Sequence, residues 1–170
     1  MSTPTGEGGE GPIKPGTAAP EFTLQREDGT EFTRADLEGQ TTVLVFYPFA
    51  FSPVCTDQLG LYEEILGELV DRGATMLAVS CDPRYAQTAF REKLGVSIPQ
   101  LSDFEPKGAT CRAFGVYHPG GFPQRALVIV GPDAVVRWSY QAASPADLPG
   151  ANLIFDGLDT AAAAARSAAR

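Results

Sequence analysis

The residue best placed for chemistry is Cys55, which lies where a predicted strand ends and a predicted helix begins. Residues 41–47 (TTVLVFY) are β-branched, aromatic and almost all apolar, which is typical of a strand buried on both faces of a sheet. From Leu59 to Leu69, apolar residues recur at helical spacing. Cys55 therefore falls in the first turn of a helix, where unpaired N–H groups and the helix dipole favour a thiolate.

Ser52 lies three residues before the cysteine, close enough to donate a hydrogen bond to the sulfur or to the group that the sulfur attacks. The pattern thus indicates a nucleophile with a small oxyanion site. A buried structural cysteine is the alternative, because free cysteines are among the most buried residues. A loop bounded by Pro48 and Pro53 is a poor place for a core residue, which favours the nucleophile.

The stretch from Pro48 through Ser52 to Cys55 matches P-x-x-x-[ST]-x-x-C and resembles the peroxidatic loop of the peroxiredoxins. Within that family the chain is most similar to the actinobacterial alkyl hydroperoxide reductase E type. The likeness extends in family order over roughly residues 17–160 and is carried by four further segments. Three of them resemble strands of the family, 18–24 (AAPEFTL), 77–82 (LAVSCD) and 125–129 (RALVI), and one, 101–103 (LSD), resembles a turn.

The resemblance implies a thiol peroxidase that reduces hydrogen peroxide, organic hydroperoxides and peroxynitrite. In this activity Cys55 attacks the peroxide, Ser52 and Arg125 stabilise the transition state, and Pro48 shapes the loop. Thiolate formation alone is a small gain, since ordinary thiols are already partly ionised at neutral pH, so polarisation of the O–O bond is expected to matter more. Gln58 departs from the family, which commonly has a glutamate there; an amide can still accept a hydrogen bond from Arg125 but adds no charge.

Two further cysteines, Cys81 and Cys111, are possible resolving residues. Neither occupies a place where the family carries its resolving cysteine, so we favour a one-cysteine mechanism. The Cys55 sulfenic acid is then reduced by an external thiol: thioredoxin, mycoredoxin or a low-molecular-weight thiol.

Two other functions fit parts of the pattern. A non-enzymatic peroxide sensor or interaction protein would use sulfenylated Cys55 to bind a partner. A papain-like hydrolase would pair Cys55 with His118, the only histidine. No cofactor is expected, and no metal site, because no two cysteines have ligand-pair spacing and there is no second histidine.

Composition limits the partners and the organisation. The chain has 170 residues and 44% hydrophobic content, from which we expect a single domain over 17–170. Residues 1–16 have almost no apolar content, so we expect them to form a disordered N-terminal tail. The net charge of −8 argues against binding to nucleic acid or to an anionic membrane. The lack of a membrane span or signal peptide and the odd, widely spaced cysteines predict a cytoplasmic protein. The family resemblance implies a homodimer formed around the active-site loops.

The order of elements predicts an α/β protein with a thioredoxin-like fold and the N-terminal extension of peroxiredoxins, in which helices flank a central mixed sheet. The elements are a hairpin at 21–33, a helical turn at 35–39, a strand at 41–47, a helix at 55–73, a strand at 75–81, a helix at 83–94, a short helix holding Cys111, a hairpin at 126–140 and a helix at 153–170.

Overall fold

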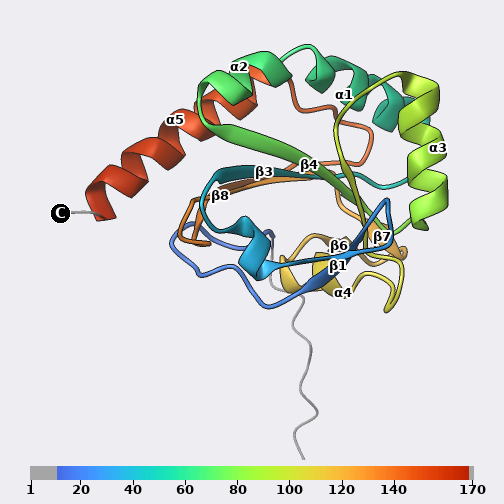
Figure 1. The fold of residues 1–170 in the computed structure, drawn as a ribbon, viewed down its shortest axis with the longest axis horizontal. Helices are drawn as coiled ribbons and strands as arrows, with labels where there is room; N and C mark the ends of the chain where they lie inside the picture. The colour runs from blue at the N-terminus through green and yellow to red at the C-terminus, as the bar shows by residue number, and fades with distance from the viewer. Residues whose placement is uncertain (1–10, 169–170) are drawn as a thin grey trace, which may run out of the picture.

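A mixed sheet of seven strands forms the centre of the molecule, shown in Figure 1 as a computed structural model that describes residues 11–168. Across the sheet the strands are β2 (Glu31–Thr33), β1 (Thr23–Arg26), β5 (Gln100–Ser102), β4 (Ala74–Ser80), β3 (Thr41–Phe46), β8 (Ala126–Val130) and β9 (Val136–Gln141). A separate two-stranded sheet pairs β6 (Tyr117–His118) with β7 (Phe122–Pro123). The predicted central mixed sheet flanked by helices is confirmed.

Helices cover both faces of the sheet (Figure 1). One face carries α1 (Pro53–Glu63), α2 (Leu66–Asp71), α3 (Arg84–Leu94) and α5 (Ala151–Ala168). The other carries the 3-10 helix η1 (Arg34–Leu37) and the short α4 (Ala109–Ala113). The two faces therefore bury two separate hydrophobic cores.

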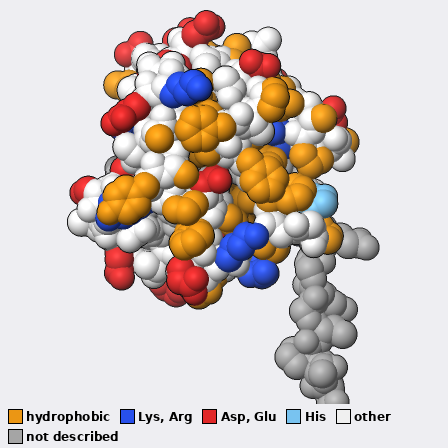
Figure 2. Space-filling view, turned by 90° about the vertical axis from the view of Figure 1, so that its right-hand side faces the viewer, with side chains coloured by type: hydrophobic (Ala, Val, Ile, Leu, Met, Phe, Trp, Pro, Cys, Tyr) orange, Lys and Arg blue, Asp and Glu red, His pale blue; other side chains and the backbone are white. Residues whose placement is uncertain are grey.

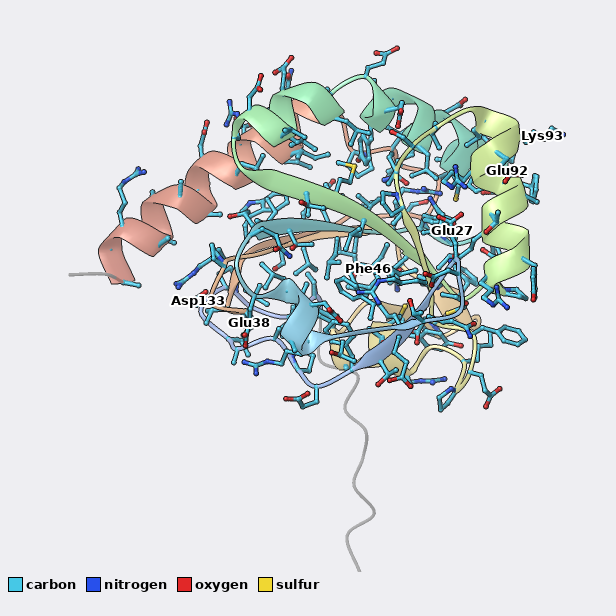
Figure 3. The ribbon with its side chains drawn as sticks, in the orientation of Figure 1. Glu27, Glu38, Phe46, Glu92, Lys93 and Asp133 are labelled. Atoms are coloured by element: carbon cyan, nitrogen blue, oxygen red, sulfur yellow. The ribbon has the colours of Figure 1, made fainter. Side chains whose placement is uncertain are left out.

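Successive side chains of β3 point to opposite faces of the sheet and so contribute in turn to the two cores. Val43 and Val45 belong to the core under α1 and α5, whereas Leu44 and Phe46 belong to the core on the α4 side. Phe46, labelled in Figure 3, packs against Phe114, with ring centroids 5.6 Å apart. Because both faces are covered, β3 is apolar throughout, which is why its sequence shows no polar alternation.

Strand pairing decides which loops meet at one end of the sheet. β3 and β4 are parallel, with Phe46 beside Val79, so the segments that follow them leave from the same edge. β8 is antiparallel to β3, with Ala126 beside Phe46, so the residue that precedes β8 lies at this edge too. The loop before α1, the turn after β4 and Arg125 therefore converge.

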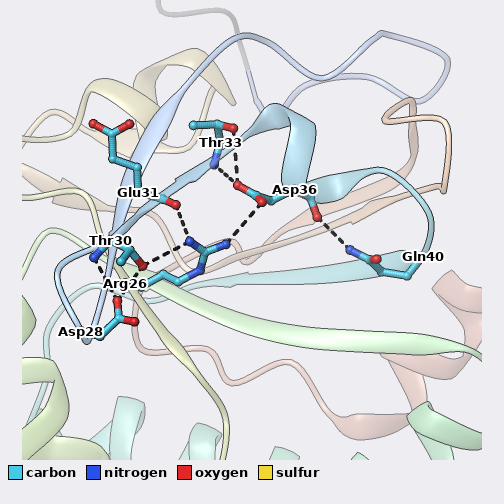
Figure 4. A network of polar contacts seen from close by, with 7 residues as sticks. All are labelled: Arg26, Asp28, Thr30, Glu31, Thr33, Asp36 and Gln40. Carbon is cyan, nitrogen blue, oxygen red and sulfur yellow. Dashed lines mark hydrogen bonds and ion pairs between the residues drawn. The ribbon is translucent and has the colours of Figure 1, made fainter.

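The turn between β1 and β2 is held by a polar network (Figure 4). Asp28 accepts hydrogen bonds from the backbone N–H and the hydroxyl of Thr30, and Arg26 also bonds Thr30 and lies 3.3 Å from Asp36. Asp36 accepts the backbone N–H of Thr33 at 2.8 Å, which lowers the pKa of the Asp36 carboxyl. The predicted hairpin at 21–33 is confirmed.

The prediction of one continuous helix over 55–73 is wrong, because the segment forms two helices. It starts at Pro53 and breaks between Glu63 and Leu66 into α1 and α2. Ile65 leaves helical geometry at φ −102° and ψ 1°, and the break lets Ile65 and Leu69 face the same core as α1. Gly60 and Gly67 flank the break and lower the helix propensity of the segment.

Two further expectations need correction. Residues 11–16, assigned to a disordered tail, are ordered: the N–H of Ile13 bonds the carbonyl of Phe114, and that of Gly16 bonds Val136. Residues 1–10 lie outside the described part of the chain. The segment 101–103, expected as a turn, contains the end of β5, which lies between β1 and β4 in the sheet. This strand has only three residues, too few for a strand pattern to be recognised in the sequence.

Candidate active site

Cys55 is the third residue of α1 and none of its surface is exposed (0%). Ser52 is the N-cap in an extended conformation, and Pro53 takes the first helical position, where its missing N–H costs nothing. The third N–H of a helix has no carbonyl of the preceding turn to bond. The predicted position of Cys55 in the first turn of a helix is therefore confirmed.

Arg125 reaches Cys55 from the adjacent strand. It directly precedes β8, and the β3–β8 register sets it beside the end of β3. Its side chain is only 2% exposed and is held by three hydrogen bonds: Nη2 donates to the Sγ of Cys55 at 3.1 Å, Nη1 donates to the Oε1 of Gln58, and Nε donates to the carbonyl of Pro145 at 2.7 Å.

The guanidinium lacks a carboxylate partner: within residues 11–168, no salt bridge involves Arg125. A buried cation without a counter-charge is costly, and a negative charge at the neighbouring sulfur or on an attacking peroxide offsets that cost. The arrangement is thus built to stabilise negative charge beside Cys55.

Gln58 continues the contact chain away from the sulfur. Its Nε2 donates to the hydroxyl of Tyr62 at 3.2 Å, and that hydroxyl donates to the carbonyl of Pro149 at 2.7 Å. Burial raises the pKa of Tyr62 to about 12, so it stays a neutral donor. Tyr62 and Pro145 were not predicted as site residues from the sequence. The i, i+4 spacing of Gln58 and Tyr62 on one helix was the available signal for Tyr62.

The loop before α1 is held from outside the helix. The N–H of Ala50 donates to the Oδ2 of Asp82, just beyond β4, at 2.8 Å, and Pro48 is buried at the end of the strand. Phe51 has φ of 69°, the left-handed region that a bulky residue seldom adopts. Ser52 donates its hydroxyl to the carbonyl of Phe49 at 3.0 Å, so it lies in the loop without a hydrogen bond to Cys55 in this structure.

Aromatic side chains of this loop face solvent. Phe49 and Phe51 are 48% and 50% exposed, although Phe51 also contacts Phe90 with ring centroids 5.2 Å apart. Figure 2 views the molecule from the α3 side and shows hydrophobic side chains exposed there. Lys93, labelled on α3 in Figure 3, lies 6.0 Å from the ring of Phe51. The exposed surface of the loop that precedes Cys55 thus includes two large apolar side chains.

Comparison with known proteins identifies the family. Residues 15–139 match the model of the AhpC/TSA family. The chain belongs to this family, the peroxiredoxins.

Similar proteins agree with this family. The alkyl hydroperoxide reductase E of Mycobacterium tuberculosis is 31% identical over 126 residues, which cover 73% of this chain and 82% of that protein. The peroxiredoxin Bcp of Escherichia coli is 34% identical over 62% of this chain and 67% of its own. The crystal structure of Enterococcus faecalis AhpC aligns with a TM-score of 0.81 at 25% identity, covering 89% of this chain and 94% of the other.

These matches confirm the predicted thioredoxin-like fold and the predicted activity. The protein is a thiol-dependent peroxidase, with a peroxide substrate and a thiol or redoxin reductant. Among residues 11–168, no helix is both long and apolar enough to span a membrane.

The other two cysteines of this peroxiredoxin lie on the opposite face of the sheet. Cys81 follows β4 on the same side as Leu77 and Val79, and Cys111 lies in α4; both belong to the core that excludes Cys55. All three cysteines are free and buried. The expectation that no metal site exists rested on sequence spacing, yet the fold brings Cys81 and Cys111 together with Asp103.

His118 is engaged elsewhere in the peroxiredoxin. Its Nδ1 accepts the N–H of Gly120 at 2.8 Å, and its ring stacks on Phe122 with centroids 4.2 Å apart. No hydrogen bond joins His118 to Cys55 within the described residues. This arrangement gives no support to a Cys-His hydrolase.

Proposed function

We propose that Cys55 is the peroxidatic cysteine of this peroxidase and that Arg125 stabilises the transition state of its oxidation. The observation that carries the proposal is the 3.1 Å contact of the Arg125 Nη2 with the Sγ of Cys55, in the first turn of α1. Pro48 ends the strand and shapes the loop, and Ser52 acts as a local donor if its hydroxyl leaves the Phe49 carbonyl when peroxide binds.

The chemical step is a two-electron transfer. The Cys55 thiolate attacks the distal oxygen of the hydroperoxide, an S–O bond forms, and the O–O bond breaks. Negative charge develops on the leaving alkoxide or hydroxide, which takes a proton to become an alcohol or water. A guanidinium already fixed at this place needs no reorganisation during the reaction, which is the basis of electrostatic catalysis.

The placement of the cysteines supports a one-cysteine cycle. A disulfide needs the two Cα atoms within about 7 Å and Cβ vectors that point toward each other. Cys55 lies in one core, and Cys81 and Cys111 lie in the other, with the sheet between them. The sulfenic acid of Cys55 is therefore reduced by an external thiol or redoxin.

Three further properties belong to the same proposal. Residues 17–168, together with the segment 11–16 that is hydrogen-bonded to them, form one domain, since both cores pack on a single sheet. The protein is a homodimer through the face that bears Phe49 and Phe51, which an isolated chain leaves exposed. The protein is cytoplasmic, because its three cysteines are free and thiols stay reduced in the cytoplasm.

The test is peroxide oxidation of Cys55→Ser followed by stopped-flow spectroscopy and intact mass measurement. Rapid peroxide turnover should be lost in Cys55→Ser, whereas Cys81→Ser and Cys111→Ser should keep the parent's first oxidation rate. In the parent, one equivalent of peroxide with dimedone present should give a dimedone adduct on the tryptic peptide that holds Cys55.

Two outcomes contradict the proposal in different ways. Parent-like peroxide turnover by Cys55→Ser would remove Cys55 from its assigned role. A disulfide of Cys55 with Cys81 or Cys111, formed faster than dimedone adds, would leave Cys55 in place and replace the one-cysteine cycle with a two-cysteine one.

A further inference from the structure

A second group of reactive side chains lies on the face of the sheet away from Cys55. The two Sγ atoms of Cys81 and Cys111 and a carboxylate oxygen of Asp103 all lie within 4.8 Å of one another. Cys81 and Cys111 are 30 positions apart in the sequence, so only the fold brings them together. The chemistry assigned to Cys55 uses none of these three groups.

Asp103 holds the two cysteine-bearing segments in place. Its backbone N–H donates to the carbonyl of Ser80, the residue before Cys81, at 2.8 Å. Its carboxylate accepts the N–H of Thr110 at 3.1 Å and the N–H of Cys111 at 2.8 Å. The end of β4 and the start of α4 are thus fixed to one residue, which presents the two thiols to each other.

Neither thiol of this pair is more deeply buried than the thiol of Cys55. Cys81 is 8% exposed, more than Cys55, while Cys111 is fully enclosed. Cys81 is therefore the thiol of the pair that a small oxidant reaches first. The pKa of the Cys111 thiol is raised by its hydrogen bond to Cys81 and by burial, so Cys111 is held as a neutral thiol until its partner reacts.

A metal ion is the less suitable occupant. A closed structural zinc site takes four protein ligands, and within residues 11–168 this cluster supplies three. Both carboxylate oxygens of Asp103 already accept backbone N–H groups. A disulfide, in contrast, is neutral, needs only the two sulfurs, and carries no charge into the core.

We propose that Cys81 and Cys111 form a second redox-active dithiol, which hydroperoxide converts to an intramolecular disulfide. This site is separate from Cys55, and its test does not depend on the role proposed for Cys55. It oxidises more slowly, because within the described residues no arginine donates a hydrogen bond to either sulfur.

The reaction balances with the peroxide that the protein's own activity consumes. The Cys81 sulfur attacks the peroxide, the O–O bond breaks, and a sulfenic acid and one alcohol or water form. The Cys111 sulfur then attacks the Cys81 sulfur, the S–O bond breaks, and water leaves with the proton that Cys111 gives up. Two thiols lose two electrons in total. The Asp103 carboxylate, within 4.8 Å of both sulfurs, is the nearby group that can take the Cys111 proton and pass it to the leaving hydroxide.

The disulfide would act on the active-site loop through one residue. Asp82 follows Cys81, and its carboxylate holds the N–H of Ala50 ahead of the Cys55 helix. Closing the two sulfurs from as much as 4.8 Å to the length of an S–S bond, about 2.05 Å, fixes the Cys81 side chain, next to Asp82, to α4. The state of the pair is thereby linked to the geometry of the loop.

The experiment uses Cys55→Ser, which isolates the pair. The protein is treated with excess hydrogen peroxide, its remaining thiols are blocked, and it is digested with trypsin without reduction. We expect a loss of two hydrogens in the intact mass and a cross-link between the peptides 73–84 and 108–112, both removed by dithiothreitol. Formation should be at least about 10²-fold slower than Cys55 oxidation in the parent, the usual effect of one missing transition-state donor.

The matched control is Cys55→Ser combined with Cys111→Ser, which should add oxygen to Cys81 and form no cross-link. The same mapping on the parent chain, where Cys55 lies in a different tryptic peptide, gives the answer even if a variant does not fold. Oxygen addition on both cysteines without the cross-link overturns the proposal. So does retention of one added Zn²⁺ per chain by the reduced Cys55→Ser protein, if peroxide then forms no disulfide.

Discussion

Arg125 is held on three sides, and each contact has a distinct origin. Gln58 comes from α1, Pro145 from the segment after β9, and Cys55 is the sulfur itself. A planar guanidinium satisfies all three because its donors form a fixed fork. Its orientation is therefore set before any peroxide arrives, which is the condition for electrostatic catalysis.

Replacement of Arg125 should show how much this orientation contributes. Arg125→Ala should slow the oxidation of Cys55 by about 10²-fold, which corresponds to about 2.7 kcal/mol of lost transition-state stabilisation. Arg125→Lys should recover only part of the rate, since a point charge cannot make the three contacts. Stopped-flow oxidation measures both, with circular dichroism to verify folding. An Arg125→Ala rate within threefold of the parent would show that the contact is incidental.

Gln58 separates the effect of a hydrogen bond from that of a charge. Gln58→Leu removes the acceptor for the Arg125 Nη1 and should slow Cys55 oxidation about tenfold, since the guanidinium loses one of its three anchors. Gln58→Glu keeps an acceptor oxygen, so its rate of Cys55 oxidation should stay within about threefold of the parent rate. Stopped-flow spectroscopy measures both variants. Equal losses in both variants would mean that the amide is needed for its bond to Tyr62 instead.

Helix α5 packs closely against the sheet at Gly157. Gly157 lies in α5 at the point where the helix crosses Trp138 of β9 and Ile129 of β8. A Cβ added there would come within 2.7 Å of the indole ring of Trp138 and 2.9 Å of the Cδ1 of Ile129. The glycine thus sets how closely the helix approaches the strands.

A methyl group at this point should destabilise the fold. Gly157→Ala should lower the free energy of unfolding by about 1–3 kcal/mol, since the overpacking exceeds the gain in helix propensity. Gly60→Ala is the matched control, because its Cβ meets nothing within 4 Å and α1 should gain about 0.5–1 kcal/mol. Urea unfolding measures both. Equal shifts in the two variants would contradict the close packing of α5.

The molecule as a whole carries a net charge of −8 and exposes two phenylalanines, Phe49 and Phe51, in the loop that precedes Cys55. Two such chains repel each other, so a dimer must gain its stability from apolar contact. Screening by salt weakens the repulsion and leaves the apolar contact intact. The salt dependence of association therefore reports which of the two effects prevails.

Analytical ultracentrifugation should find the parent as a dimer of 18.0 kDa chains whose association strengthens with added salt. Phe49→Glu should dissociate it, because it buries a charge in the apolar contact. Val70→Glu, at a residue 71% exposed on α2, should leave the dimer intact. A parent that sediments as a monomer at micromolar concentration would refute the homodimer.

Local pattern was sufficient to predict much of the protein. The strand before Cys55, the start of the helix that holds it and the hairpins could be inferred from the sequence because side-chain periodicity and turn residues act over a few positions. The position of Cys55 in a first helical turn belongs to this group. The family was recognised separately, from the resemblance of the segment that runs from Pro48 to Cys55 to a known motif. Arg125 was found through the motif of its strand, since no local rule distinguishes it from a surface arginine.

Tertiary structure decided what depends on strand order and packing. The contact of Arg125 with Pro145, the bond from Ala50 to Asp82 and the placing of β5 between β1 and β4 join residues far apart in the chain. The same holds for Cys81 and Cys111, which the sequence places 30 positions apart and the fold places side by side. Contacts of this kind depend on which surfaces the whole chain can bury together, and no short stretch of sequence carries that information.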